Sequence, residues 1–526
     1  MIENSIIPEF MMYSDGLEPI ELEQLASRIE MEGRTNKDDF MLYTDILLEF
    51  VGSGEWKNRS DAFLAMCAKA SFLRGKYGFN QILARGTNNL ACKGYAAAAY
   101  CRQSLDPRWL NNLRNIMNQA WQAKEYIVFA ELAGLLASVL IDLGYTDHSA
   151  EIATDSIDKV TKISAKDQTI RNRVQAALLR ARIILAFIAR SSISREEAFI
   201  RLDSAEDTAK HLNHNLALTD IGFYRARVFM DQHEYDRSKA LLTSALRKYE
   251  RMGYLQGVAD AKNIEGVMLL NTGLLQEARD VFEELLIVQQ QLNNQVGLAN
   301  TLINVGEIDR TLGQIDQMET YNRRALEISQ EAEYMRGIAT ATANLGDVEL
   351  RKGNIVEATE HYEKVIELAD GAGMKDLLVI TLFLAGDANY LTGEFDDAIA
   401  IYRRAKQVCT DVGYPLSAFN ADVSEIVTRW TMSEPPSEEL VSLVSSFIGK
   451  KDDWLENPDP ELMAEVRRRV FDDPSVESTL CVFFDGERNF ECRVERKSLK
   501  KECFGNLFWM GSLCPYFKEF LARFYD

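Results

Sequence analysis

The stretch NLGDVELRKGNIVEAT, residues 344–359, combines an amphipathic pattern with two glycines and recurs along the chain. NVGEIDRTLGQIDQME begins forty residues earlier, at Asn304, and LAGDANYLTGEFDDAI begins forty residues later, at Leu384. A fixed period of about 20–50 residues is the signature of stacked structural repeats. The chain is therefore predicted to grow by adding units, rather than by enlarging one core.

Four positions keep this spacing through consecutive units. A glycine inside a predicted helix lets a neighbouring helix approach closely, and a second glycine ends that helix in a left-handed C-cap. A small residue five positions on lets a second helix pack back, and an aromatic ring four positions later fills the gap. Each unit is thus predicted to be an antiparallel helical hairpin. The positions are Gly266, Gly306, Gly346 and Gly386; Gly273, Gly313, Gly353 and Gly393; Ala278, Ala358 and Ala398, with Met318 in the remaining repeat; and Phe282, Tyr362 and Tyr402.

The pattern Gly-x6-Gly-x4-Ala-x3-Tyr/Phe is similar to that of tetratricopeptide repeats. Its long, forty-residue form resembles the repeats of kinesin light chains, spindle-orientation adaptors and bacterial peptide-pheromone sensors. The resemblance implies a mainly α fold, a right-handed α-solenoid of tetratricopeptide helical hairpins. The segment near the C-terminus is rich in residues that favour β-strands, so we also expect a small α+β cap there.

Proline marks the ends of the predicted solenoid. None occurs between Pro107 and Pro415, and a proline inside a helix costs about 3 kcal/mol. We predict an N-terminal helical region (1–57), a tetratricopeptide-like α-solenoid (58–430, with the pattern clearest over 255–413), a linker with short helices (431–475), and a small C-terminal domain of a β-hairpin plus helix (476–526).

Composition excludes several classes of protein. The net charge of −21 repels nucleic-acid phosphates and anionic lipid, so we expect neither nucleic acid nor a membrane as a direct partner. No disulfide framework is evident among the eight cysteines, which predicts a cytoplasmic protein. Phosphate-binding, dinucleotide-binding and HExxH motifs do not occur in the chain. We therefore predict neither catalysis nor a cofactor.

Polar side chains that recur on the first helix of each hairpin predict a ligand-binding groove. Asparagine suits a peptide ligand because its amide both donates and accepts hydrogen bonds, and an acidic ladder favours a partner with basic residues. In tetratricopeptide adaptors these positions resemble the residues that hold an extended peptide. The alternative is that they are solvated helix residues beside required glycines. The predicted groove residues are Asn300, Asn304, Glu307, Arg310, Thr340, Asn344, Asp347, Arg351 and Asp387.

The resemblance does not extend to co-chaperones that grip a C-terminal carboxylate. Those proteins use a basic residue at one groove position. Here that position holds no basic residue, only Asn263, Ile303, Ala343 and Phe383.

Cysteines and histidines offer two candidate metal sites. Cys481, Cys492, Cys503 and Cys514 are spaced eleven apart, and a turn centred on Gly486-Glu487 would set Cys481 opposite Cys492. Four thiolates could hold zinc tetrahedrally, but the usual Cys-x2–4-Cys knuckles do not occur. Buried reduced thiols are the preferred interpretation, and no metal is predicted. The pair His211 and His214 is interpreted as two surface histidines.

These observations favour a non-enzymatic scaffold or adaptor that binds a peptide or protein segment in a concave groove for complex assembly. The alternative is a regulatory peptide sensor whose solenoid changes shape when the ligand binds. The pattern does not specify the oligomeric state.

Overall fold

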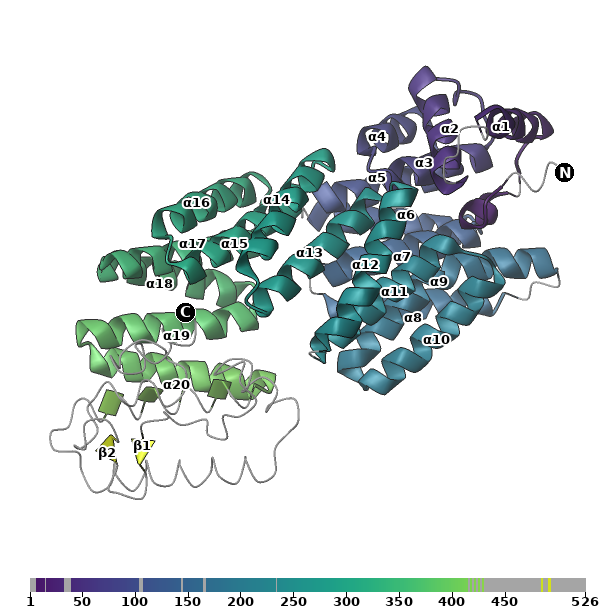
Figure 1. Ribbon diagram of the computed structural model, residues 1–526. Helices are drawn as coiled ribbons and strands as arrows, with labels where there is room; N and C mark the ends of the chain where they lie inside the picture. Colours follow the sequence, from purple (N-terminus) through teal and green to yellow (C-terminus); the bar gives the residue numbers. More distant parts are fainter. Residues whose placement is uncertain are drawn as a thin grey trace. The chain divides into compact units, whose positions relative to one another are not determined.

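A computed structural model describes residues 6–14, 16–32, 39–103, 107–142, 145–163, 167–232 and 234–414. It also describes positions 417–418, 421, 424–425 and 428–429 and the strand residues 484–485 and 491–492. Consecutive helices fill the long described ranges (Figure 1), which confirms the predicted mainly α fold. The chain forms two compact units, Met1–Gly337 and Ile338–Asp526, and this division lies inside the predicted solenoid.

The first unit begins with a 3₁₀ segment and continues as helices joined by short turns. Its elements are η2 (Pro8–Tyr13), α1 (Pro19–Glu32), α2 (Asp39–Ser53), α3 (Asp61–Leu73), α4 (Tyr77–Gly86), α5 (Leu90–Gln103), α6 (Pro107–Gln122), α7 (Tyr126–Asp142), α8 (Thr146–Thr161), α9 (Gln168–Ser192), α10 (Arg195–His211), α11 (Asn215–Asp231), α12 (Tyr235–Met252), α13 (Leu255–Asn271), α14 (Leu275–Gln291), α15 (Gln295–Leu312) and α16 (Ile315–Glu331).

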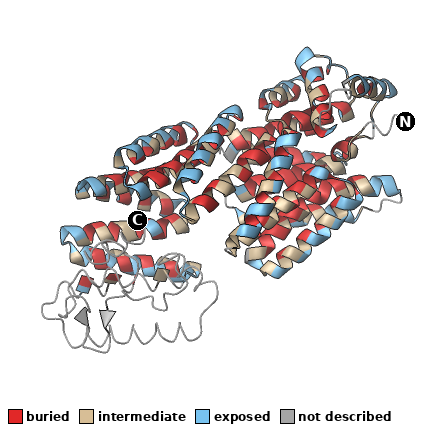
Figure 2. Cartoon of the chain, in the orientation of Figure 1, coloured by how far each residue is buried: buried red, intermediate tan, exposed pale blue. Residues whose placement is uncertain are grey.

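The odd-numbered helices of this unit form an inner layer. Each of α3, α5, α7, α9, α11 and α13 contacts the next odd-numbered helix, while the even-numbered partner of each hairpin packs outside. The helices of this unit also close back on themselves: α5 contacts α15 within the inner layer, and α2 contacts α12 outside it. Helix α7 is buried without interruption from Phe129 to Leu140, as expected of a helix that is apolar on all sides (Figure 2).

The repeated glycines have the two roles that their spacing predicts. A Cβ atom at Gly266, Gly346 or Gly386 would lie 2.4–2.6 Å from the ring of Phe282, Tyr362 or Tyr402 respectively, so only glycine admits the ring. The helix-ending glycines are left-handed, with φ of 76° at Gly273, 72° at Gly313, 88° at Gly353 and 84° at Gly393. Both predicted roles are confirmed.

A second set of turns, between hairpins, also keeps the forty-residue spacing but was missed in the sequence. Its residues all have positive φ, which favours glycine or asparagine. Only some of them are glycine, so the pattern is less visible: Asn213, Gly253, Asn293, Glu333, Gly373 and Gly413.

The second unit continues the hairpins. Helix α17 (Met335–Lys352) crosses the division between the units, and α18 (Ile355–Gly371), α19 (Lys375–Thr392) and α20 (Phe395–Val412) follow. The predicted linker, and the predicted C-terminal domain except for two short strands, lie outside the described residues.

Those strands, β1 (Phe484–Asp485) and β2 (Glu491–Cys492), pair antiparallel. Phe484 faces Cys492 across the pair, so the predicted opposition of Cys481 and Cys492 is wrong. The physical reason is that the strands close across a connection longer than a two-residue turn, which moves the centre of pairing beyond Gly486-Glu487.

Candidate ligand-binding site

The predicted groove residues of the first unit lie on α15. Asn304 is half-buried, and its Nδ2 donates to Asn263 Oδ1 on α13 across 3.4 Å. Asn300 is exposed, and its Oδ1 accepts from the Tyr334 hydroxyl at 3.1 Å. These asparagines therefore already hold side-chain partners while keeping amide groups near the surface. Their binding of a ligand stays a prediction.

The acidic ladder consists of the predicted groove residues Glu307, Asp347 and Asp387, one from each of three consecutive repeats. Two of these carboxylates form an ion pair with an arginine of the same helix. On α15, Arg310 forms an ion pair with Glu307, three residues before it. On α17, the Arg351 Nε donates to Asp347 Oδ2 at 2.9 Å. Each carboxylate is thus offset by a cation of its own helix, so neither is a bare negative charge for a basic ligand. Thr340 and Asn344, also on α17, are half-buried.

Asp387, the third member of the ladder, has a different partner. Leucine stands at position 391, where the preceding unit has Arg351, and the Tyr402 hydroxyl donates to Asp387 Oδ1 at 2.6 Å. Burial raises the pKa of Asp387 to about 7, against the lowering effect of this hydrogen bond. The residue is therefore partly protonated near neutral pH, which weakens its predicted role as an anionic contact.

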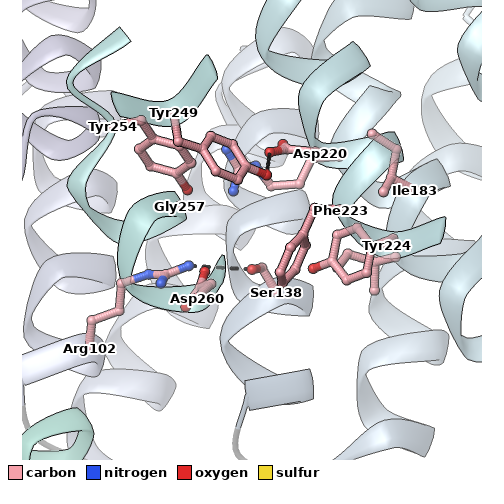
Figure 3. A pocket seen from close by; sticks show the side chains of 12 residues that line it. Arg102, Ser138, Ile183, Asp220, Phe223, Tyr224, Tyr249, Tyr254, Gly257 and Asp260 are labelled. Carbon is pink, nitrogen blue, oxygen red and sulfur yellow. Dashed lines mark hydrogen bonds between the residues drawn. The ribbon is translucent and has the colours of Figure 1, made fainter. Parts of the chain in front are cut away.

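The forty-residue register of Asn300 continues upstream into an unpredicted group of half-buried charged residues. Counting back in steps of forty from Asn300 gives Asp260, Asp220 and Arg180, on α13, α11 and α9. All three line a cavity of about 30 Å³ in the first unit (Figure 3). Asp260 also lines an adjoining cavity of about 270 Å³, which Asn300 borders.

In the smaller cavity, tyrosines and an arginine meet carboxylates. The Tyr249 hydroxyl donates to Asp220 Oδ1 at 2.7 Å, and the Arg102 Nη2 lies 3.4 Å from Ser138 Oγ (Figure 3). Burial raises the pKa of Asp220 to about 6, although Arg180 and the Tyr249 hydrogen bond oppose the shift. This interior is a network of neutral and charged groups in low-dielectric surroundings.

The larger cavity carries two carboxylates, on α7 and α13. Asp260 accepts from Gln256 Nε2 at 2.8 Å, and Asp142 has Arg102 Nη2 at 3.8 Å. The Asp142 side chain keeps 44% of its surface exposed, and it lines the cavity wall. Burial raises the pKa of Asp142 to about 6, with the Asp260 carboxylate adding to the shift, and burial also raises the pKa of Asp260.

Three buried polar atoms among the residues of this wall have no hydrogen-bond partner: Gln256 Oε1, Gln289 Oε1 and Arg102 Nε. The three residues are only 5%, 6% and 8% exposed. Native proteins pair nearly all buried polar groups, so such atoms at a cavity are available to bind water or a ligand. Gly297 leaves room for the Gln289 amide, because a Cβ there would lie 2.4 Å from its Cδ.

The N-terminal segment docks on the same inner layer. Glu9 in η2 is 1% exposed, and its Oε1 accepts from the backbone N–H of Asn215 at 2.8 Å and of Leu216 at 3.4 Å. These N–H groups open α11, where the helix dipole favours a carboxylate. Ser14 Oγ accepts from Arg173 Nη2 on α9 at 2.6 Å. Two contacts thus hold this segment against helices far away in the sequence.

The histidine prediction is wrong for His214. This residue is 5% exposed and caps α11, its Nδ1 accepting from the Ala217 N–H at 3.1 Å. Burial lowers its pKa to about 3, so the ring is neutral and able to accept. The i,i+3 spacing from His211 did not reveal this because the ring lies at the boundary of two helices.

Within the described ranges, no three histidine, cysteine or acidic side chains gather as a metal site. The four cysteines proposed for zinc lie outside the residues whose side chains are described. Among the described helices, none has the length and the apolar character to cross a bilayer.

Two segments match tetratricopeptide repeat families: residues 225–293 and residues 337–411. The chain therefore contains tetratricopeptide repeats, which confirms the prediction from the glycine and alanine spacing. No curated protein matches the sequence.

Solved structures show only a distant likeness. Aspartyl phosphate phosphatase F from Bacillus subtilis has a TM-score of 0.41 and 11% identity, over 65% of this chain and 90% of that one. A Rap protein complexed with Competence and Sporulation Factor has a TM-score of 0.43 and 14% identity, over 66% of this chain and 99% of that one. A signal transduction ATPase with a tetratricopeptide repeat sensor from Pyrococcus horikoshii has a TM-score of 0.45 and 12% identity, over 84% of this chain and 73% of that one. With TM-scores below 0.5, these likenesses carry no argument about ligand or activity.

Proposed function

We propose that this protein is a non-enzymatic tetratricopeptide repeat scaffold or adaptor that binds an extended peptide or protein segment on its inner helices. One observation carries the proposal: Gln256 Oε1, Gln289 Oε1 and Arg102 Nε lie unpaired at the larger cavity. A peptide unit offers one N–H donor and one C=O acceptor, and so complements both kinds of unpaired atom. Leaving such a group unpaired costs about 1–3 kcal/mol, which a bound peptide would recover.

The charge of the chain favours partners of one kind. A net charge of −21 disfavours nucleic acid and anionic membranes and favours protein segments with basic residues. The predicted groove asparagines Asn304 and Asn344 would extend the binding surface in each unit by pairing with ligand backbone. Joining such a ligand to other proteins is the adaptor role, which we place in the cytoplasm.

The test is affinity selection from an equimolar library of acetylated, amidated pentapeptides by the full-length chain, read by mass spectrometry. We expect retention by the wild type and an affinity loss of at least about fivefold in Gln256→Leu/Gln289→Leu, because two acceptors are removed. Gln290→Leu is the matched control, since Gln290 is exposed on the same helix, α14, as Gln289. No retention by the wild type, or equal retention by the double variant, would contradict the proposal.

A regulatory peptide sensor is the second candidate. The observation that favours it is the docked N-terminal segment, because the Glu9 contact with α11 joins elements that a conformational change could separate. Small-angle scattering with and without a selected peptide distinguishes the two candidates. Unchanged dimensions favour the scaffold, and a changed profile favours the sensor.

A further inference from the structure

Two of the three unpaired polar atoms at the larger cavity are hydrogen-bond acceptors. The orientation of the Gln256 amide is set because its Nε2 donates to Asp260 Oδ1 at 2.8 Å, which leaves Oε1 as the free acceptor. Gln289 Oε1 is a second free acceptor, and Asp142 adds a second carboxylate to the wall. A ligand that satisfies this wall must bring donors.

Two arginines, Arg102 and Arg227, also line the larger cavity, and each makes a contact of its own. Arg102, from α5, is shared between Ser138 Oγ at 3.4 Å and Asp142 at 3.8 Å. The Arg227 guanidinium, from α11, lies over the Phe187 ring, 4.2 Å from its centroid. Arg180, from α9, lines the smaller cavity together with Tyr254. None of these arrangements places a cation in close contact with both carboxylates of the larger cavity.

The size of the cavity limits what enters it. At about 270 Å³ it is just below the range of about 300–1,000 Å³ that is usual for pockets of drug-sized ligands. One side chain or one chain end of a longer segment fits such a space, and a folded partner does not.

We infer that the segment bound here inserts a cationic group, an ammonium or a guanidinium, against Asp142 and Asp260, with Gln256 Oε1 and Gln289 Oε1 as further acceptors. This inference rests on the proposed function and names the chemistry of the ligand. The group comes either from a basic side chain or from a free N-terminus, both of which supply several N–H donors and a positive charge.

Binding of a cation at this site is then linked to the release of a proton. The raised pKa of Asp142, about 6, and the raised pKa of Asp260 mean that this pair retains a proton in part of the population near pH 6. Arg102, Arg180 and Arg227 oppose this retention, whereas Asp220 and Tyr224 are the other acidic groups nearby. A ligand cation favours the doubly ionised pair, so its arrival releases the proton to solvent.

The experiment uses the full-length chain and three pentapeptide libraries. The first has blocked ends and a central lysine, the second has blocked ends and norleucine in its place, and the third has norleucine and a free N-terminus. Peptides retained from each library are then measured by calorimetry at pH 6 in two buffers of different ionisation heat. We expect the first or the third library to be retained at least tenfold better than the second, with net proton release.

Asp142→Asn and Asp260→Asn test the site directly. Asparagine has the size and shape of the carboxyl group that it replaces, so both variants should fold. We expect each to lower the affinity for the cationic peptides at least tenfold and to abolish proton release. The control Asp207→Asn changes an exposed carboxylate on α10 and should behave as the wild type.

The outcomes separate the inference from the proposed function. Equal retention of all three libraries, or cationic binding that survives both Asp variants, overturns the inference and leaves the peptide-binding proposal intact. Retention of none of the libraries overturns both.

Discussion

Gly346 on α17 lies directly against the ring of Tyr362 on α18. A Cβ atom at Gly346 would stand 2.6 Å from Tyr362 Cε1, closer than van der Waals contact allows. Tyr362 is fully buried, so its ring has little room to withdraw. The same relationship holds between Gly386 and Tyr402, where the distance would be 2.4 Å. Close approach of the two helices in these two hairpins therefore depends on a missing side chain.

Gly346→Leu is expected to destabilise the second unit. Overpacking of a filled core costs about 1–3 kcal/mol, which lowers the melting temperature by several degrees in a protein of this size. Calorimetry of the variant checks this. In a double-mutant cycle, Gly346→Ala should cost less in a Tyr362→Leu background than in the wild type. Additive effects in that cycle would show that the ring does not limit this position.

Gly353→Ala should destabilise for a different reason. Gly353 has a φ of 88°, and nothing lies within 4 Å of the position that a Cβ would take. The cost is therefore backbone strain alone, about 1–2 kcal/mol. Gly353→Asn should cost less, because asparagine tolerates this conformation, as Asn213 and Asn293 do at other turns. Urea denaturation of both variants measures the difference, and equal stability of Gly353→Ala and wild type would contradict the prediction.

The hairpins could be predicted from local sequence patterns because each repeated glycine meets one physical requirement, and that requirement arises within its own hairpin. Gly346 needs space for Tyr362, and Gly353 needs a left-handed turn. Both requirements act over at most sixteen residues of sequence. Gly306 shows the limit of this reasoning, since its neighbour is the amide of Asn322 and no aromatic ring.

The cavity was only partly within reach of the sequence. Continuing the register of Asn300 by steps of forty places Asp260 and Asp220 on the inner helices, so these two could have been found. Arg102 and Asp142 belong to helices outside that register. Arg102 is brought to the cavity by α5, which contacts α15 although the two helices are far apart in the sequence.

Asp387→Asn is expected to remove part of the pH dependence of stability. The folded pKa of about 7 exceeds the ordinary value of 3.8, so the native state binds a proton more tightly than the unfolded state. The resulting stabilisation is full below about pH 4 and is lost as pH rises toward 7. Urea denaturation from pH 4.5 to 7.5 should show a shallower fall in unfolding free energy for the variant.

The control for this series is Asp397→Asn, which changes an exposed carboxylate on α20. It should retain the wild-type slope. Parallel curves for wild type and Asp387→Asn would mean that Asp387 ionises normally and that its bond with Tyr402 does not depend on burial.

The predicted groove asparagines can be separated from the acidic ladder. Asn304→Ala/Asn344→Ala removes amides that would pair with ligand backbone, and each lost partner costs about 1–3 kcal/mol, or roughly 5- to 150-fold in affinity. The triple variant Glu307→Lys/Asp347→Lys/Asp387→Lys reverses the charge of the acidic ladder. It should therefore slow the association of a basic peptide, and added salt should mask this effect. Because Glu307 and Asp347 are ion-paired with arginines, the triple variant also needs a stability measurement. Unchanged peptide affinity in both variants would restrict binding to the cavity.

The last prediction concerns Glu9, which joins the N-terminal segment to α11. Glu9→Ala leaves the part-buried N–H group of Asn215 and the buried N–H group of Leu216 without this acceptor, at a cost of about 1–3 kcal/mol. Glu9→Gln keeps an acceptor oxygen and should lose much less, which separates the hydrogen bond from the effect of size. Amide hydrogen exchange of residues 6–14 and of the first turn of α11 is the measurement. We expect faster exchange in both segments for Glu9→Ala only. Faster exchange confined to residues 6–14 would show that α11 is capped without Glu9, chiefly by His214, whose Nδ1 accepts from the Ala217 N–H at 3.1 Å.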